Sequence, residues 1–384
     1  MRNVNQSASI WSMIPCITTH KRKRMCIIFC AITVILLVLV TAIATPIVII
    51  MKKRYSTTEK STVTTMEKRS TAITERKTTK GHSSFPINSN TKWKPNPVII
   101  SAVNDLDRLH SPIGIYIDDD SRSIYVASWG GHCIVGWKFN QTNGEIVAGS
   151  KESGNGINQL HYPTDLIADK ETDSLIICDE GNRRIVQWFR QNRTNPQIII
   201  PHIYCARLII DRNGDFYVSD WFNNKVIRWN MVNKEGTIVA GGNGNGNQSN
   251  QLSSPRGVFV DRDFSVYVAD LENHRIMKWM KDANEGIVVA GGNGGGNNLT
   301  QLCSPEGVIV DHFGNVYVAD TKNKRIMRWS VESQEGSIIL GADSIGQQSN
   351  PFEVPGDISF DGDGNLYVAD FNKRRIQKFL VDSS

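Results

Sequence analysis

A short motif that recurs at a nearly constant interval constrains the fold of this chain more than any other feature. Residues 267–270, 317–320 and 367–370 all read YVAD, and residues 217–220 read YVSD. Two degenerate copies precede them, YVAS at residues 125–128 and IICD at residues 176–179. From one copy to the next, the first residue advances by 51, 41, 50, 50 and 50 positions. A period of this length predicts a repeat architecture with six units.

Each unit contains four short apolar runs that are separated by turn residues. The runs are rich in Val and Ile and are bounded by Gly, Asn, Asp or Pro, which is typical of strands. In the fifth unit they are GVIVD (307–311), VYVAD (316–320), RIMRWS (325–330) and SIILG (337–341). Four antiparallel strands that repeat radially describe a blade of a β-propeller. We therefore expect an all-β fold, a six-bladed propeller.

The last unit indicates how the ring closes. It ends with its third run, RIQKFL at residues 375–380, and lacks a fourth. Just before the first unit, VIISA at residues 98–102 matches the pattern of the fourth runs in the other units. We predict that this N-terminal strand pairs with the C-terminal one, which would leave no unpaired edge between blades.

The repeats resemble a known family. YVAD followed by LENHRI, TKNKRI or FNKRRI, and preceded by SPRGVFVD or SPEGVIVD, is similar to the NHL repeat. The resemblance covers roughly residues 97–384, and it is strongest in units three to six. The first unit departs from the pattern at Ser128, and the third lacks the Gly/Asn-rich loop, which explains the short step of 41 residues. The resemblance implies a six-bladed propeller.

The N-terminal region contains a candidate membrane anchor. Residues 25–51 are 27 residues without a charge, which exceeds the length that spans a bilayer. A cleaved signal peptide with a site near residues 42–44 is the alternative, but its apolar region is normally shorter. We expect a short basic cytosolic tail at residues 1–24, a single transmembrane helix at residues 25–51 and a disordered stalk at residues 52–96. The propeller follows at residues 97–384.

The flanks of the apolar segment suggest an orientation. Four basic residues precede it and three follow, so the charge bias is slight. A short N-terminal tail favours a type II protein with a signal anchor, whose propeller lies outside the cell or in a lumen. The Ser/Thr-rich stalk cannot bury a core, and it is either O-glycosylated or an unmodified spacer.

Four N-x-[ST] sequons lie in the propeller region, between the expected strands. Asn is common in this region, so four sequons are no excess over chance. Their placement nevertheless suits a bulky glycan and a luminal or extracellular glycoprotein. The candidate N-glycosylation sites are Asn140, Asn192, Asn247 and Asn298.

The charge distribution argues against nucleic-acid binding. Residues 1–96 carry 16 Lys and Arg against 3 acidic residues, whereas residues 97–384 carry 27 against 35. The propeller is therefore acidic, although the whole chain has a formal charge of +5. Some NHL-family propellers bind RNA through a basic face, which requires clustered cations. We expect no nucleic-acid partner here.

The cysteines leave the disulfide pattern open. Four of the seven lie in the propeller region, and in an oxidising compartment they allow three pairings that the sequence cannot distinguish. A buried thiol is an ordinary alternative for Cys178. The chain has no C-x-x-C motif and hence no RING-type zinc module. The disulfide candidates are Cys133, Cys178, Cys205 and Cys303.

One loop position suggests a metal site. Two residues before the Pro that opens a first strand, the units carry His, Ser, Cys or Glu, and zinc accepts His, Cys and carboxylate ligands. Free variation of loop residues before a Pro is the simpler interpretation. The candidates at this position are His110, His161, Cys303 and Glu353.

Two acidic residues suggest a second kind of site. Asp165 and Asp357 replace the glycine found at Gly257 and Gly307, and channel carboxylates bind calcium in some propeller hydrolases. Peptidyl-hydroxyglycine amidating lyases are similar propellers with histidine-bound zinc. In that family the ligand histidines follow the strand-opening Pro, and no histidine occupies those positions here. We predict no cofactor, with zinc or calcium as the ions that these residues would suit.

The function that the sequence favours is therefore binding rather than catalysis. We expect a membrane-anchored NHL-type propeller that binds an extracellular or luminal protein, peptide or glycan. The alternative is a metal-dependent lyase or hydrolase of the secretory pathway, similar to the amidating lyases, with its site in the propeller channel. The fold cannot decide between them, because function belongs to the site.

Overall fold

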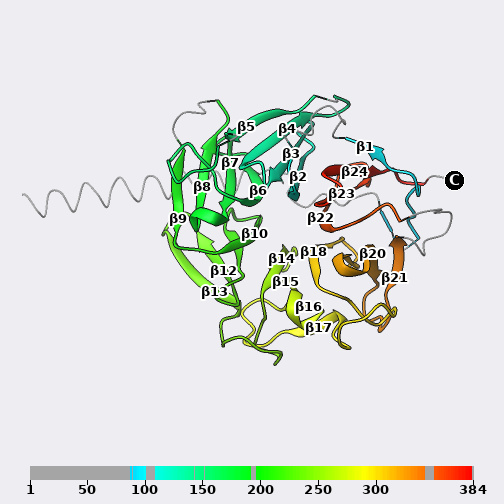
Figure 1. Cartoon of the computed structure of the whole chain (residues 1–384). Helices are drawn as coiled ribbons and strands as arrows, with labels where there is room; N and C mark the ends of the chain where they lie inside the picture. The colour runs from blue at the N-terminus through cyan, green and yellow to red at the C-terminus, as the bar shows by residue number, and fades with distance from the viewer. Residues whose placement is uncertain are drawn as a thin grey trace, which may run out of the picture. The chain divides into compact units, whose positions relative to one another are not determined.

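The protein forms a ring of six four-stranded antiparallel sheets, as Figure 1 shows. The computed structural model describes residues 87–88, 90–100, 109–141, 143–150, 152–191, 196–341 and 350–382. All of them belong to one compact unit that spans Lys80–Ser384. The prediction of an all-β, six-bladed propeller is confirmed.

The first three blades follow one another along the chain, each running from the channel outwards. Blade 1 contains β2 (Pro112–Asp118), β3 (Ser123–Ser128), β4 (Cys133–Lys138) and β5 (Glu145–Gly149). Blade 2 contains β6 (Pro163–Asp169), β7 (Ser174–Asp179), β8 (Arg184–Phe189) and β9 (Gln197–Pro201), with η2 (Glu180–Asn182) after β7. Blade 3 contains β10 (Cys205–Ile210), β11 (Phe216–Asp220), β12 (Lys225–Asn230) and β13 (Glu235–Gly241).

The last three blades complete the ring with the same strand order. Blade 4 contains β14 (Pro255–Val260), β15 (Val266–Asp270), β16 (Arg275–Trp279) and β17 (Ile287–Gly291), with η3 (Leu271–Asn273). Blade 5 contains β18 (Pro305–Val310), β19 (Val316–Asp320), β20 (Arg325–Trp329) and β21 (Ser337–Leu340), with η4 (Thr321–Asn323). Blade 6 contains β22 (Pro355–Phe360), β23 (Leu366–Asp370), β24 (Arg375–Phe379) and the N-terminal β1 (Val98–Ile99).

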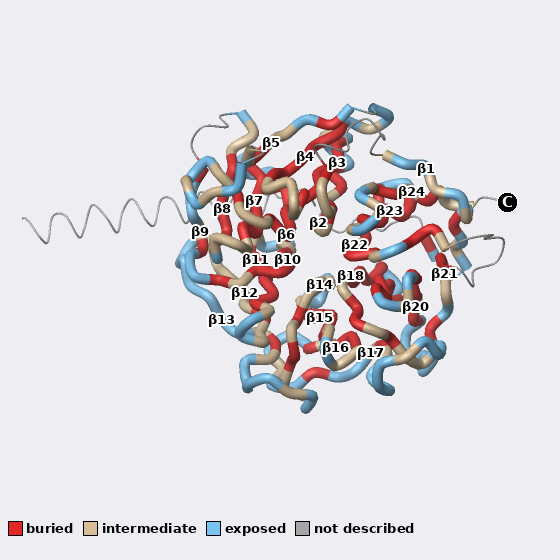
Figure 2. The backbone as a smooth tube through the Cα atoms, viewed as in Figure 1, coloured by how far each residue is buried: buried red, intermediate tan, exposed pale blue. Residues whose placement is uncertain are grey.

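The hydrophobic core lies between neighbouring blades rather than within each sheet. In one cluster, Tyr267 and Ala269 of blade 4 pack with Val308 and Val316 of blade 5. Figure 2 shows buried backbone along the strands and exposed backbone mainly in the connecting loops and outer strands. Because the alternate side chains of a strand point to opposite faces, each sheet contributes to the cores on both of its sides.

The ring closes where the N-terminal segment joins the last sheet, as predicted. Val98 pairs with Lys378 and Ile99 with Gln377 in an antiparallel register. Closure extends further toward the N-terminus than expected, because Trp93 forms a bridge with Val381. The indole of Trp93 also donates a hydrogen bond of 3.0 Å to the carbonyl of Gly364.

Packing on the propeller therefore begins before residue 97. Ile87 and Trp93 are 2% and 5% exposed and belong to the core cluster that fills the interface of blades 5 and 6. Both lie in the segment that we expected to be stalk, so the C-terminal part of that segment is folded. The tail at residues 1–24, the apolar segment at residues 25–51 and the rest of the stalk lie outside the described residues. Within the described ranges, no helix has the length and apolarity that a bilayer crossing requires.

The aspartate that ends the second strand organises the loops at one end of blades 2, 4, 5 and 6. In blade 5, Asp320 Oδ2 lies 2.7 Å from Arg325 Nε, and both side chains are buried. The other carboxylate oxygen of Asp320 accepts a hydrogen bond of 2.7 Å from the backbone N–H of Cys303. Arg325 in turn donates to the carbonyls of the preceding inter-blade loop, such as Asn297 at 2.7 Å. The motif therefore positions the loop that enters the first strand.

Candidate functional site

One end of the propeller brings together the loops that lead into each first strand and the turns after each second strand. We call this end the channel-mouth face. Backbone hydrogen bonds connect the two loops, from Gly130 N to His110 O at 3.1 Å and from Gly181 N to His161 O at 2.8 Å. The same bond runs from Lys322 N to Cys303 O at 3.2 Å in blade 5. The residues that we selected two positions before Pro therefore lie on this face.

The structure confirms that these loop residues occupy equivalent positions. In four blades the backbone N–H of the residue donates to the aspartate that ends the second strand, and in blade 1 the acceptor is Ser128 Oγ. The donor–acceptor pairs are His110–Ser128 at 2.9 Å, His161–Asp179 at 2.7 Å, Ser253–Asp270 at 2.7 Å, Cys303–Asp320 at 2.7 Å and Glu353–Asp370 at 2.9 Å. The equivalence follows from the backbone, so it does not require a shared ligand.

The side chains at these positions do not converge. The His161 ring lies 4.3 Å from that of Tyr162 and 5.6 Å from that of His132. The exposed carboxylate of Glu353 accepts a long hydrogen bond of 3.4 Å from Asn372. Among the residues that the structure describes, no group of three or more His, Cys, Asp and Glu residues is placed to hold a metal ion.

Asp165 and Asp357 lie on the innermost strands of their blades and join neighbouring blades. Each lies two residues after the Pro that opens its strand, where blades 1, 4 and 5 have glycine. Asp165 Oδ2 accepts the backbone N–H of Leu208 in blade 3 at 2.8 Å. Asp357 Oδ2 accepts the backbone N–H of Ile115 in blade 1 at 3.1 Å. Both candidate calcium ligands therefore already bind backbone across a blade boundary.

Arg207 crosses the channel between these two carboxylates. Its Nη1 donates to the carbonyl of Thr164 at 3.2 Å, and its Nη2 donates to Ile113 at 2.9 Å and Gly356 at 3.3 Å. Its Nε lies 3.6 Å from Asp357 Oδ2. One guanidinium from blade 3 thus contacts blades 1, 2 and 6, which makes it the centre of the ion cluster.

Arg207 is not among the residues that we predicted from the sequence. A signal existed, because blade 3 begins its first strand with Cys205-Ala206-Arg207, where the other blades have Pro, one variable residue, and Gly or Asp. A long cation at a glycine position, together with two acids at the same position in other blades, indicates a group of mutually compensating charges. We had compared only the units that contain the Pro.

A second pair of charges lies beside this cluster. Arg256 and Glu306 each directly follow a strand-opening Pro, and Arg256 also lies over the Trp221 ring at 5.2 Å. Burial raises the pKa of Glu306, although Arg207 and Arg256 oppose the shift. Burial lowers the pKa of Arg256, which Glu306 partly offsets. The two residues place a polar pair at the mouth of the channel.

Burial also controls the charge of the carboxylates in the channel. It raises the pKa of Asp165 to about 7, with Arg207 lowering it and Asp357 raising it. The pKa of Asp357 is raised by burial too, and again Arg207 opposes the shift. Desolvation disfavours the charged form of a carboxyl, and three carboxyls share two cations in this cluster. Asp165 therefore changes its charge close to neutral pH.

Aromatic side chains cover part of the channel-mouth face. Trp129 of blade 1 stacks on Tyr162 of blade 2 at 4.1 Å and lies 6.0 Å from Phe371 of blade 6. In blade 3, Tyr204 stacks on Phe222 at 4.5 Å and meets Trp221 edge-on at 5.9 Å. All six are at least partly exposed. We call them the aromatic arc: Trp129, Tyr162, Tyr204, Trp221, Phe222 and Phe371.

Blades 4 and 5 lack this arc. The positions of Trp129, Trp221 and Phe371 are taken by Leu271 and Thr321, and those of Tyr162 and Tyr204 by Ser254 and Ser304. The face is thus aromatic over blades 6, 1, 2 and 3 and largely polar over the other two. Nothing in the repeat requires aromatic residues there, because blades 4 and 5 fold without them.

A disulfide lies behind the arc. Cys178 on β7 and Cys205 on β10 are joined, with their Cα atoms 5.6 Å apart. The bond connects blades 2 and 3, and both cysteines are buried. Of the other two disulfide candidates, Cys133 is buried and Cys303 is half-buried.

The exposed sequons lie where a glycan fits. Asn140, Asn247 and Asn298 are exposed and lie between strands. Asn192 lies outside the described residues.

Comparison with known proteins supports the fold alone. No protein-family model matches the chain, and no curated protein matches it. Its similarity to solved structures is low in sequence, between 13% and 16% identity for three of the most similar. An auxiliary nutrient binding protein from Bacteroides thetaiotaomicron is 16% identical with a TM-score of 0.58, and the match covers 78% of this chain and 75% of that one. A protein of unknown function from the same bacterium is 16% identical with a TM-score of 0.57, over 76% of this chain and 73% of that one. A gluconolactonase from Xanthomonas campestris is 13% identical with a TM-score of 0.54, over 78% of this chain and 100% of that one.

Proposed function

We propose that this protein is a non-catalytic binding module that captures an extracellular or luminal protein, peptide or glycan on its channel-mouth face. The aromatic arc carries the proposal. Trp, Tyr and Arg dominate the energetics of protein recognition surfaces. The arc contains four Trp and Tyr residues, of which Tyr204 lies under Arg183 and Trp221 under Arg256. An exposed Phe222, 57% accessible, adds apolar area that a partner would cover.

The channel cluster supports binding over catalysis. Asp165 and Asp357 each use a carboxylate oxygen to hold the backbone of the next blade. Arg207 makes its hydrogen bonds to backbone carbonyls of four blades, its own included. These contacts give the cluster a structural task, which is to hold together the four blades that bear the arc.

The enzymatic alternative also has an observation in its favour. A carboxyl with a pKa near neutrality suits general acid–base chemistry, and that of Asp165 is raised to about 7. A metal-dependent lyase or hydrolase that acts in the channel would use Asp165 or Asp357 together with a zinc or calcium ion. Metal analysis of the purified chain separates the two functions, since only this alternative expects stoichiometric metal that is lost in Asp357→Asn.

We further propose that the chain is an NHL-repeat protein whose propeller lies on the non-cytosolic side of a membrane. The YVAD repeats and the uncharged segment at residues 25–51 support a single-pass type II protein of the plasma membrane or secretory pathway. The Cys178–Cys205 bond supports an oxidising compartment, where disulfides persist. The acidic propeller supports a partner other than nucleic acid. Glycosidase treatment should increase the gel mobility of the protein, and an unchanged mobility together with a protease-protected propeller in intact cells would contradict this orientation.

The proposed binding function is tested with the full-length chain. The purified, labelled protein would be applied to peptide and glycan arrays and to intact cells, next to the arc variant Trp129→Ala/Tyr162→Ala. We expect the variant to lose at least about tenfold in affinity, as central aromatic residues do at binding surfaces. The matched control is Thr321→Ala/Lys322→Ala on blade 5, which should bind normally. Equal binding by the arc variant and the wild type would contradict the proposal.

A further inference from the structure

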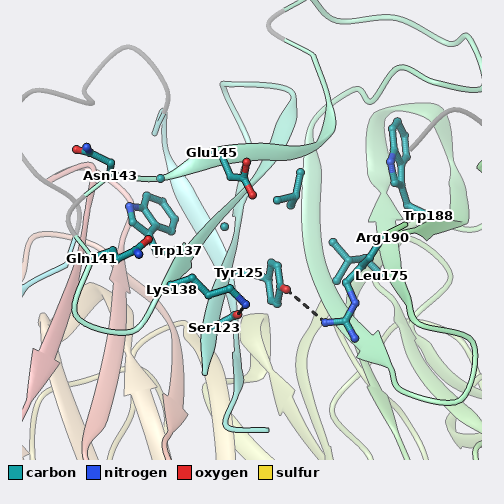
Figure 3. Close-up of a pocket in the computed structure, with 13 residues that line it drawn as sticks. Ser123, Tyr125, Trp137, Lys138, Gln141, Asn143, Glu145, Leu175, Trp188 and Arg190 are labelled. Atoms are coloured by element: carbon teal, nitrogen blue, oxygen red, sulfur yellow. Dashed lines mark hydrogen bonds between the residues drawn. The ribbon is translucent and has the colours of Figure 1, made fainter. Parts of the chain in front are cut away.

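A cavity of about 500 Å³ opens between blades 1 and 2, away from the channel-mouth face. Figure 3 shows Trp137 of β4 and Trp188 of β8 on opposite sides of it, with Tyr125 and Glu145 between them. Its volume is within the range of small-molecule sites, which lies at roughly 300–1,000 Å³. None of our candidate residues lines this cavity, so its origin and chemistry need a separate explanation.

A single glycine opens the cavity. Gly136 of β4 pairs with Tyr125 of β3, and at this register the other five blades carry a long polar side chain. These side chains are Gln187, Arg228, Lys278, Arg328 and Lys378. In blades 4 and 6 the lysine lies over the partner tyrosine, at 4.9 Å and 5.0 Å from the ring centre. In blade 1 no side chain fills that space.

The neighbouring blade places a cation beside Tyr125, but this cation does not fill the space that Gly136 leaves open. Arg190 of blade 2 donates to Tyr125 Oη at 3.3 Å and to Asp118 Oδ2 at 3.2 Å. Its Nε donates to Asp173 Oδ1 at 2.7 Å. The guanidinium is therefore neutralised by two carboxylates, and a ligand in the cavity would face it as a paired rather than a free charge.

The remaining groups around the cavity offer hydrogen bonds of both kinds. Trp137 and Trp188 contribute their rings to the cavity wall, because their indole nitrogens are buried and out of reach of a ligand. Lys138 donates only to Ser123 Oγ at 2.9 Å and to the Ser121 carbonyl at 3.1 Å. The amides of Gln141 and Asn143 supply both donors and acceptors, and the carboxylate of Glu145 also lines the cavity.

These properties select the class of ligand. A sugar ring presents C–H groups, which suit aromatic walls, and hydroxyl groups that each donate and accept hydrogen bonds. Glu145 would repel an anion and Lys138 would repel a cation, whereas the hydroxyl groups of a neutral saccharide can form hydrogen bonds with both side chains. We propose that the cavity between blades 1 and 2 is a saccharide-binding site, opened by Gly136 and distinct from the channel-mouth face.

Two saccharides could occupy this cavity: a glycan attached to this chain, or a saccharide from outside. Asn140 lies in the hairpin between β4 and β5, it is exposed, and it directly precedes Gln141 at the cavity. Residues 140–142 read NQT, which is an acceptor sequence for an N-linked glycan. The first sugars of a glycan on Asn140 or an external saccharide would meet the same walls.

The test is a variant in which the cavity is filled by the kind of side chain that the other blades carry at the position of Gly136. Gly136→Lys introduces the residue found in blades 4 and 6, and its Cβ would lie 3.1 Å from Val147 Cγ1 and 3.2 Å from Tyr125 Cδ1, so small shifts accommodate it. Full-length Asn140→Gln protein, which cannot carry the glycan, would be mixed with N-acetylglucosamine, mannose, galactose or glucose. Saturation-transfer NMR would detect binding. We expect at least one sugar to bind, with at least a tenfold loss of affinity when Gly136→Lys is added.

Two further comparisons complete the test. If the glycan of Asn140 occupies the cavity, wild-type protein should bind free sugar more weakly than Asn140→Gln, whereas equal binding indicates an external saccharide. If Gly136→Lys does not fold, as judged by thermal unfolding, Glu145→Gln replaces it and should weaken binding severalfold. No signal from any of the sugars, or an unchanged signal in the cavity variants, would overturn the proposal.

Discussion

Blades 4 and 5 have the same four-stranded architecture as blades 1 to 3, but the two groups use their polar and aromatic residues differently. In blade 5 the pair Asp320–Arg325 is buried and holds the entry loop, and blade 4 repeats it with Asp270–Arg275 at 2.8 Å. Blade 1 has Ser128 and Cys133 in the same register. Blade 2 keeps the pair as Asp179–Arg184 at 2.7 Å, but blades 1 to 3 also carry most of the aromatic arc, and the open cavity lies between blades 1 and 2. Departures from the repeat are therefore informative about the site.

Breaking the buried pair of a regular blade should have the largest effect. Removing one partner leaves a buried charge, which typically costs about 3–5 kcal/mol. We therefore expect Arg325→Ala to lower the free energy of unfolding by about that amount in chemical denaturation. In blade 1 the partner position of this pair is Ser128, and Ser128→Ala removes a hydroxyl that bonds to the His110 backbone and should cost about 1 kcal/mol. Equal losses would show that the two blades do not differ in this respect.

Removing the cation of the channel cluster should have the next largest effect. Arg207→Met keeps an unbranched apolar side chain without the guanidinium, so it leaves Asp165 and Asp357 without their cation, and we expect a loss of several kcal/mol at pH 7. Because protonation removes the uncompensated charge, the loss should shrink as the pH falls toward 5. Denaturation curves at both pH values measure this. A pH-independent loss would assign the effect to lost packing instead.

The cluster also predicts the sign of a pH dependence. The folded-state pKa of Asp165 is raised to about 7, above the usual value near 4 in an unfolded chain. Between these values the folded protein binds more protons, so stability falls as the pH rises from about 4 to 7. Asp165→Asn should flatten this slope, by up to about 4 kcal/mol over the interval, because each pH unit between the two pKa values contributes about 1.4 kcal/mol. A slope that is identical in the variant would place the titration elsewhere.

The arc should give the smallest effect on stability. Phe222 is 57% exposed, and exposed substitutions usually change stability by less than about 0.5 kcal/mol. We expect Phe222→Ser to leave the midpoint of thermal unfolding nearly unchanged while weakening partner binding. A large loss of stability would mean that the stack with Tyr204 is part of the core.

The regular blades could be predicted from the sequence almost residue by residue. In the fifth unit the expected strands differ from β18 to β21 by one or two residues at their ends. The closing strand was also predictable, because VIISA repeats the pattern of every fourth strand. The positions of His110, His161, Cys303 and Glu353 were correctly recognised as equivalent. What they do was not predictable, since a shared backbone position does not make side chains converge.

The sequence by itself determined the period, the strand pattern and the closure of the ring, because these depend on local hydrophobic alternation and on turn residues. Only the tertiary structure decided which residues meet across blades. Arg207, Asp165 and Asp357 belong to three different repeats, and Gly136 matters only because Arg190 and Trp188 of the next blade face it. A propeller buries its core between neighbouring sheets, so its sites are formed by residues that are far apart in the chain and come together when the ring closes.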